Sequence, residues 1–228
     1  MKTLLRTLPL AVLLWLVQSA SVFAVDDVAA TKHNLASTQP TAGNIRTADT
    51  AFVCGFCHSP HTEAGGPAPL WNRTSPTGPY TMYTSATMDM TAAASPASIS
   101  LACLSCHDGT VAFDQLINGA GSGGYNAGGA SQGWAFTDGT SAVANTMPAG
   151  VTNLGTNLTG DHPISVTYDP TADTAFVALA TVQASSVQLY GGSEDQVECA
   201  SCHNPHEATN PTFLRVAIDT LCTTCHIK

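Results

Sequence analysis

Charged side chains are scarce in this sequence, and basic ones are scarcer than acidic ones. Asp, Glu, Lys and Arg make up 10% of the 228 residues, with 7 basic against 16 acidic side chains. The formal net charge of −9 would repel phosphate backbones and anionic lipid headgroups. Nucleic acid and acidic membrane surfaces are therefore disfavoured as partners.

The sequence also has few long amphipathic runs of the kind that predict a helical bundle or a regular sheet. It contains 19 glycines and 13 prolines, which interrupt helix and strand patterns. Residues 25–53 read as an extended polar arm, and the Gly/Ser-rich stretch 119–133 as flexible or tightly turned. β-Branched and aromatic residues at 163–168 and 174–188 are compatible with short strands. We expect a chain that is mostly coil, with few short helices and short strands.

The clearest hydrophobic run lies at the N-terminus. Lys2 and Arg6 precede an apolar run at 8–17, and small residues follow up to Ala24. This pattern is typical of a secretory signal peptide cleaved after Ala24. An uncleaved anchor is the weaker alternative, because the run is short for a membrane span. We therefore expect a signal peptide at 1–24, one exported domain at 25–228, and no membrane span after processing.

No cysteine lies outside four copies of one motif. All 8 cysteines belong to C-x-x-C-H sequences, numbered here motif 1 (54–58), motif 2 (103–107), motif 3 (199–203) and motif 4 (222–226). This motif is typical of covalent c-type haem attachment, in which two thiols form thioethers to the porphyrin and the histidine binds iron. A disulfide framework would not require a histidine after every second cysteine, and a zinc site has no reason to repeat this pattern four times.

The motifs therefore predict four covalently bound haem c groups, around which the coil is organised in place of a conventional core. The predicted thioether residues are Cys54, Cys57, Cys103, Cys106, Cys199, Cys202, Cys222 and Cys225. The predicted proximal ligands of the irons are His58, His107, His203 and His226.

The histidines outside the motifs are equal in number to the predicted irons. The chain has 8 histidines, so one spare imidazole is available for each motif, and the predicted distal ligands are His33, His61, His162 and His206. The alternatives are a solvated surface histidine at His33 and hydrogen bonds to a haem propionate from His61 and His206. Sulfur ligands are available in principle at 82, 88 and 90, but the histidine balance favours these methionines as haem-contacting filler.

Motifs 1 and 3 both continue as C-H-x-P-H, which places His61 and His206 three residues after a proximal ligand. At about 3.3–3.6 Å per residue, three residues cannot easily join opposite faces of one haem. Each of these histidines is therefore expected to reach a neighbouring haem, with His206 serving motif 4 and His61 serving motif 2. His33 and His162 would then serve motifs 1 and 3, in an order that the spacing leaves open.

The order of the motifs, together with the sequences at 31–35, 69–73, 103–112, 153–156 and 161–164, resembles the tetrahaem extracellular cytochromes of OmcE type. The resemblance covers nearly all of the mature chain. It implies a multihaem cytochrome c whose subunits stack into a filament, or nanowire, with one iron ligated by a histidine of the adjacent protomer. His33, on the N-terminal arm, is the candidate for that ligand.

Two imidazoles per iron close the coordination sphere, which favours electron transfer over enzymatic chemistry. The predicted function is electron transfer as a subunit of an extracellular or cell-surface filament, with other redox proteins or external acceptors as partners. A periplasmic tetrahaem carrier would need the same residues and stays an alternative. A multihaem reductase is less favoured, because it would need an iron with an open position.

Overall fold

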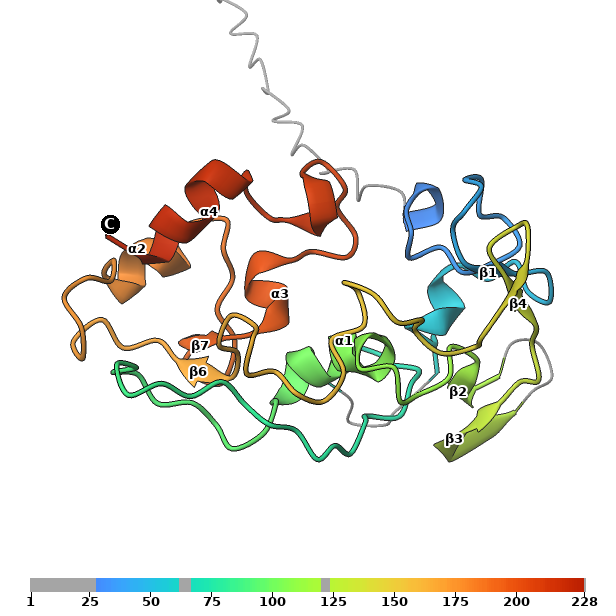
Figure 1. Ribbon diagram of the computed structural model, residues 1–228, viewed down its shortest axis with the longest axis horizontal. Coiled ribbons are helices and arrows are strands. Elements are labelled where there is room, and N and C mark those ends of the chain that lie inside the picture. Colours follow the sequence, from blue (N-terminus) through green and yellow to red (C-terminus); the bar gives the residue numbers. More distant parts are fainter. Residues whose placement is uncertain (1–27, 62–66, 120–123, 228) are drawn as a thin grey trace, which may run out of the picture.

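The computed structural model describes residues 28–61, 67–119 and 124–227, so the predicted signal peptide and its cleavage site lie outside the described residues. Coil predominates, and the helices and strands are short (Figure 1). The expectation of a mostly coiled chain is therefore confirmed. Within the described ranges, no helix is both long enough and apolar enough to cross a membrane.

The secondary structure consists of small elements spread along the chain. In order they are η1 (Val28–Ala30), β1 (Arg46–Thr47), η2 (Cys54–Phe56), α1 (Ser98–His107), β2 (Gln115–Asn118), β3 (Tyr125–Ser131), β4 (Phe136–Thr137), β5 (Ala142–Val143), β6 (Val166–Thr167), α2 (Leu179–Gln183), β7 (Gln196–Val197), α3 (Cys199–Cys202), η3 (Pro211–Phe213) and α4 (Ile218–Cys225). The strands pair antiparallel in the orders β1-β4-β5, β2-β3 and β6-β7.

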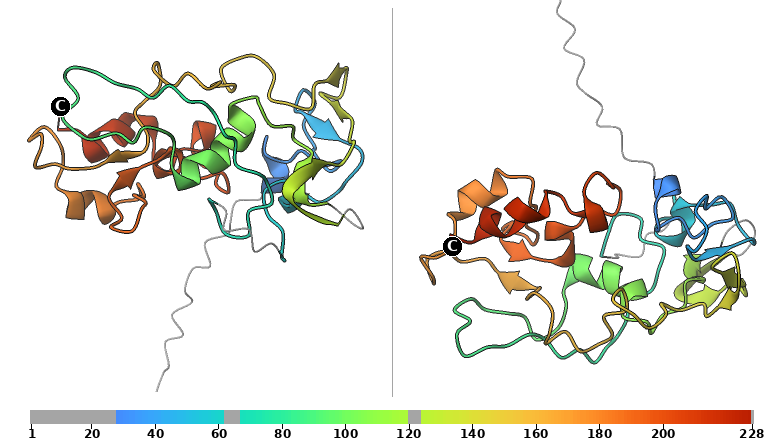
Figure 2. Two further views of the ribbon diagram at one scale, coloured as in Figure 1. Left: turned by 90° about the horizontal axis from the view of Figure 1, so that it is seen from below. Right: turned by 45° about the horizontal axis from the view of Figure 1, so that its top comes forward.

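The elements are laid out along one long axis. Figure 1 shows β1 to β4 with the N-terminal segment at one end and α2, α4, β6 and β7 toward the other, with α1 and α3 between them. The views in Figure 2 show the same succession. Motifs 2, 3 and 4 lie on α1, α3 and α4, and motif 1 begins on η2. The four motifs are thus distributed along the length of the molecule.

Two small apolar clusters stabilise the two ends. Both contact cysteines of the motifs: Cys57 and Cys106 pack against the first cluster and Cys225 against the second. The buried members are Ala36, Phe56, Phe113 and Phe136 in the first, and Tyr168, Val182, Val187 and Leu189 in the second. Haem attached at these cysteines would therefore extend existing apolar clusters.

The N-terminal segment is not the extended arm that its composition predicted. Its backbone is folded into turns closed by side-chain amides, and Asn34 is fully buried. The Gln39 side chain donates to the carbonyls of Thr31 at 2.7 Å and Asn34 at 2.8 Å. Such bonds follow no helical or strand period, so the hydrophobic pattern does not reveal them.

Two further local expectations were wrong. The stretch 174–188, read as compatible with a short strand, contains the helix α2, and its buried valines Val182 and Val187 pack into the second cluster. The glycine-rich stretch 119–133 contains β3, which pairs with β2 across an irregular register. The strand at 163–168 is reduced to Val166–Thr167.

Candidate haem-binding sites

Backbone carbonyls orient several of the candidate iron ligands. A hydrogen bond at Nδ1 fixes the ring and leaves Nε2 available for a metal. In each case below, Nδ1 is the nitrogen that bonds the carbonyl. The distances are 2.7 Å from His58 to Pro69, 2.8 Å from His107 to Thr152, 2.8 Å from His203 to Thr212 and 2.9 Å from His162 to Pro163.

Six of the eight histidine rings form three facing pairs. Each pair combines the histidine of a motif with one from outside it. The centre-to-centre distances and interplanar angles are 6.3 Å and 85° for His33 and His107, 6.0 Å and 25° for His58 and His206, and 6.5 Å and 74° for His162 and His226. With metal–nitrogen bonds of about 2.0 Å and ring centres about 1.1 Å behind each nitrogen, an iron between two imidazoles puts their centres about 6.2 Å apart. The pairs therefore fit iron ligation by two histidines.

These pairings correct the ones expected from sequence spacing. His206 faces the histidine of motif 1 instead of that of motif 4, which faces His162. The reason is that the chain after motif 3 folds back on it: His203 forms a bridge with Leu214, and the Asn204 amide donates to Phe213 at 2.8 Å. Closeness in sequence to motif 4 therefore does not determine where His206 points.

His33 is packed inside the chain, which favours a ligand site within its own protomer over the predicted role as ligand for a neighbouring protomer. Its ring lies 4.4 Å from that of Phe213 and 6.3 Å from that of His107. Burial, followed by the proximity of His107, lowers the pKa of His33 to about 4. A neutral imidazole is the form that binds a metal, so this environment fits a ligand of motif 2.

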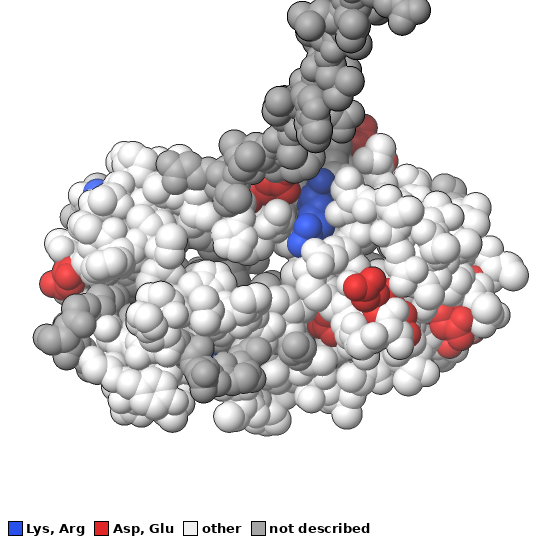
Figure 3. Space-filling model, turned by 180° about the vertical axis from the view of Figure 1, so that it is seen from behind, with Lys and Arg blue, Asp and Glu red and all other residues white. Residues whose placement is uncertain are grey.

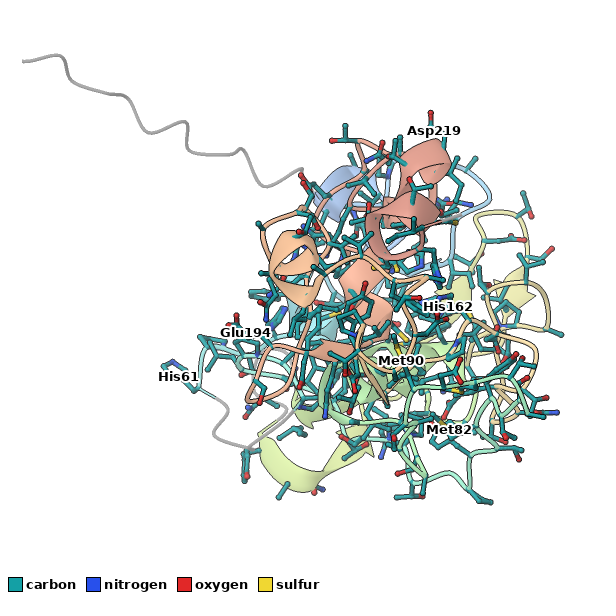
Figure 4. All side chains as sticks on the ribbon, turned by 90° about the vertical axis from the view of Figure 1, so that its left-hand side faces the viewer. His61, Met82, Met90, His162, Glu194 and Asp219 are labelled. Atoms are coloured by element: carbon teal, nitrogen blue, oxygen red, sulfur yellow. The ribbon has the colours of Figure 1, made fainter. Side chains whose placement is uncertain are left out.

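His61 and His203 are the two histidines that belong to none of the three pairs. The ring contacts found in the described part of the chain give neither of them a histidine partner. Figure 4 shows His61 at the periphery, with its side chain directed away from the body of the molecule. His203 is also exposed, and its Nδ1 is bonded to a carbonyl, so its other nitrogen can face a ligand site.

The cysteines connect the motifs in chain order. Burial first, and then the Cys106 thiol, raise the pKa of Cys57 to about 12. Cys103 and Cys199 lie close enough for their thiols to share a hydrogen bond. Cys202 is near both cysteines of motif 4. Motif 1 therefore neighbours motif 2, motif 2 neighbours motif 3, and motif 3 neighbours motif 4.

Motifs 1 and 3 have the same local architecture, which the sequence reasoning missed. In each, a returning segment pairs with the chain after the proximal histidine; we call these the motif 1 hairpin (54–61 with 67–73) and the motif 3 hairpin (199–216). The matching amide-to-carbonyl bonds are Ser59 to Leu70 and Asn204 to Phe213, and Asn72 to Cys57 and Arg215 to Cys202. The available signal was the shared C-H-x-P-H followed by an apolar pair, Leu70-Trp71 or Phe213-Leu214.

Buried polar side chains hold the hairpins to the rest of the fold. Asn72 donates to Gly55 at 2.7 Å and to Asn118 at 3.0 Å, which fixes motif 1 to β2. Glu198, next to motif 3, accepts hydrogen bonds from the hydroxyls of Ser100 and Ser165. These residues were not identified from the sequence, because a single polar residue carries no periodic signal.

Two further observations bear on the fit to haem. The Trp71 indole nitrogen is buried without a hydrogen-bond partner, and its ring lies 5.7 Å from that of His58. It could donate to a polar group of a haem beside it. All 8 cysteines are free of disulfides, and over the described ranges no three His, Cys, Asp or Glu side chains gather into a metal-binding group. Met82, Met88 and Met90 line a common surface pocket, and their role stays a prediction.

Comparison with known proteins supports the haem interpretation for the C-terminal part of the chain. Residues 193–228, which contain motifs 3 and 4, match the family described as "Doubled CXXCH motif". A search of curated proteins found no match. The doubled motif points to a multihaem c-type cytochrome, a protein that binds haem covalently and transfers electrons.

Proposed function

We propose that this protein is a tetrahaem cytochrome whose protomers join head to tail into an extracellular filament that carries electrons to external acceptors. The observation that carries the proposal is the histidine pairing: three proximal histidines have a partner at iron-spanning distance within the chain. The fourth, His203, and the spare His61 are the two rings that this pairing leaves over in the described chain. Each protomer thus offers one ligand and needs one.

Bound haem would supply the reversible one-electron change between ferric and ferrous iron. The side chains of the motifs would hold it: two cysteines form thioethers and two imidazoles close the coordination sphere, which keeps the potential low and excludes a substrate from the iron. The contacts between cysteines of successive motifs would bring the porphyrin edges close together. This favours rapid transfer along the molecule.

The relation between the two hairpins supports a ligand contributed by another protomer. Within one chain, His206 of the motif 3 hairpin faces His58 of the motif 1 hairpin. The same relation with the roles of the two hairpins exchanged, made by the motif 1 hairpin of the next copy, would place its His61 opposite His203. Such a contact joins two different surfaces of identical subunits, so it generates an open filament when it does not close into a ring.

The surface is compatible with this assembly. Most of the face shown in Figure 3 carries neither acidic nor basic side chains. Identical copies that met through such a face would experience little charge repulsion, in spite of the net charge of −9. An exported location is part of the proposal, because c-type haem is attached outside the cytoplasm.

The test is the assembly state of the full-length protein, produced with a haem-attachment system and imaged by electron microscopy. The wild-type protein is expected to form filaments in which every haem is low-spin. His61→Ala is expected to give single particles with four haems, one of them high-spin. Added imidazole should restore the low-spin spectrum of that haem without restoring filaments.

His206→Ala is the matched control, because it removes the equivalent histidine of the other hairpin. It should open one iron while filaments persist. Wild-type protein that stays as single particles with only low-spin haem would favour the periplasmic carrier, with His61 bound within the chain. High-spin haem in the resting wild-type filament would instead favour an enzyme.

A further inference from the structure

The two hairpins differ in charge at the position that follows their second paired amide. The backbone amides of Asn72 and Arg215 occupy equivalent places, since each donates to the carbonyl of the second cysteine of its motif. The next residue is Arg73 in the motif 1 hairpin and Val216 in the motif 3 hairpin. Val216 packs against the second apolar cluster. At this position the motif 1 hairpin therefore has a buried cation and the motif 3 hairpin a hydrocarbon side chain. The guanidinium of the motif 3 hairpin, on Arg215, stands one residue earlier and donates to the Ala200 carbonyl at 2.8 Å.

Arg73 is almost completely buried, with 2% of its surface exposed. Its Nε donates to the Ser105 hydroxyl at 3.1 Å, and its terminal nitrogens donate to the carbonyls of Ser105, Ala112 and Phe113, each at 2.8 Å. These acceptors are neutral. The guanidinium is therefore solvated by peptide and hydroxyl dipoles, which leave its full positive charge inside the protein.

The charge lies between two candidate haem sites. Ser105 stands inside motif 2, between its two cysteines. The same charge acts on Cys57 of motif 1, whose thiol neighbours Cys106. Arg73 thus contacts one motif and is electrostatically coupled to the other, so attached haems would feel its charge through a dry interior.

Two buried carboxylates of this region form hydrogen bonds with groups other than Arg73. Asp108 accepts hydrogen bonds from Tyr80 and from Thr110. Asp114 accepts four, from Ser131, Gly133, Trp134 and Asn145. They reduce the local positive potential without neutralising Arg73 through a contact.

We infer that Arg73 tunes the reduction potentials of the haems of motifs 1 and 2, by stabilising their ferrous forms. Each reduction takes one electron from an external donor, converts one ferric haem to ferrous, and makes or breaks no bond. The added negative charge is attracted by the buried guanidinium. The inference rests on the proposed attachment of four haems and does not depend on filament formation.

The experiment is a spectroelectrochemical titration of the full-length haem-loaded protein. Arg73→Gln and Arg73→Met are expected to lower the equilibrium constants for reduction of two of the four haems by about tenfold, which is 59 mV for a one-electron couple. Arg73→Lys keeps the charge and should shift them much less. Arg46→Gln is the charge-matched control, since Arg46 bonds the Thr41 carbonyl at an exposed position, and it should leave the titration unchanged.

Neutral variants whose potentials match those of the Arg46→Gln control would overturn the inference. An equal shift in Arg73→Lys would also overturn it, because the cause would then be packing. If the neutral variants fail to retain haem, Val216→Arg supplies an independent test: it should raise two potentials, and no rise would count against the inference. A wild-type protein with fewer than four haems would contradict the proposed function instead.

Discussion

The rings of His58 and His206 stand 6.0 Å apart, although each histidine belongs to a different C-H-x-P-H sequence. The histidine that follows motif 3 therefore lies beside the candidate iron ligand of motif 1. Haem insertion at these motifs would fasten together parts of the chain that are distant in sequence.

Replacing one ligand of this pair should change one haem selectively. His206→Met is expected to raise one of the four reduction potentials, because histidine/methionine ligation gives higher potentials than ligation by two histidines. A spectroelectrochemical titration of dissociated protomers measures this. His61→Met is the control, since His61 has no partner ring in the described part of one protomer; an equal shift in both variants would contradict the pairing.

Asn72→Ala should destabilise the motif 1 hairpin. The Asn72 side chain bonds Gly55 and Asn118 from a site that is 2% exposed, so its removal leaves buried backbone groups unpaired. A loss of about 2–4 kcal/mol in the free energy of unfolding is expected. Guanidinium unfolding followed by circular dichroism provides the measurement. Asn126→Ala, at an exposed site in β3, should cost less than about 1 kcal/mol.

Gly109→Ala should disturb the site at motif 2. Gly109 has a φ of +73°, and a Cβ added there would lie 2.5 Å from the side-chain nitrogen of Asn153. The neighbouring Thr152 carbonyl orients His107, so movement of this loop should also alter the spectrum of one haem. We expect a loss of at least about 2 kcal/mol.

Gly43→Ala tests the effect of backbone strain in the absence of a steric clash. Gly43 has a φ of +85°, and an added Cβ would meet no atom within 4 Å. This variant should cost about 1–2 kcal/mol through strain alone and leave the haem spectrum unchanged. Equal losses and unchanged spectra in both glycine variants would show that the Thr152 loop does not control His107.

Glu198 should make stability depend on pH. Burial raises the pKa of this carboxyl, against the opposing effect of the Ser100 and Ser165 hydroxyls. As the pH rises above the ordinary glutamate pKa of about 4.3, the unfolded chain loses this proton before the folded chain does. The free energy of unfolding should therefore fall with rising pH until the folded pKa is passed.

Glu198→Gln should remove that fall. Its stability relative to the wild-type protein is expected to increase as the pH rises from about 4, whatever constant difference the amide introduces. Unfolding at several pH values measures the slope. Glu194→Gln, at an exposed site, should keep the wild-type slope; a Glu198→Gln slope identical to wild type would refute this assignment.

The sequence predicted the composition of the sites better than their connections. The C-x-x-C-H repeats identify candidate haem residues because this chemistry requires fixed local spacing. The geometric argument at C-H-x-P-H correctly turned His206 away from His203, but it assigned the wrong neighbour. That choice depends on how the returning segment 211–216 packs, which no local pattern encodes.

The buried polar residues were equally hard to predict. Arg73 and Asn72 follow Leu70 and Trp71 in a segment that reads as a loop, and nothing in their order shows that both become buried. Their positions are determined by acceptors far along the chain, such as Phe113 and Asn118. Only tertiary structure brings these groups together.

The angles between paired rings would also give the irons separate spectroscopic identities. The planes are 25° apart for His58 and His206 but 85° and 74° apart in the other two pairs. Because the orientation of the two ligand planes sets the splitting of the iron d orbitals, chemically identical ligands would produce different electron paramagnetic resonance signals. The arrival of an electron at motif 1 could then be followed separately from its arrival at motifs 2 and 4.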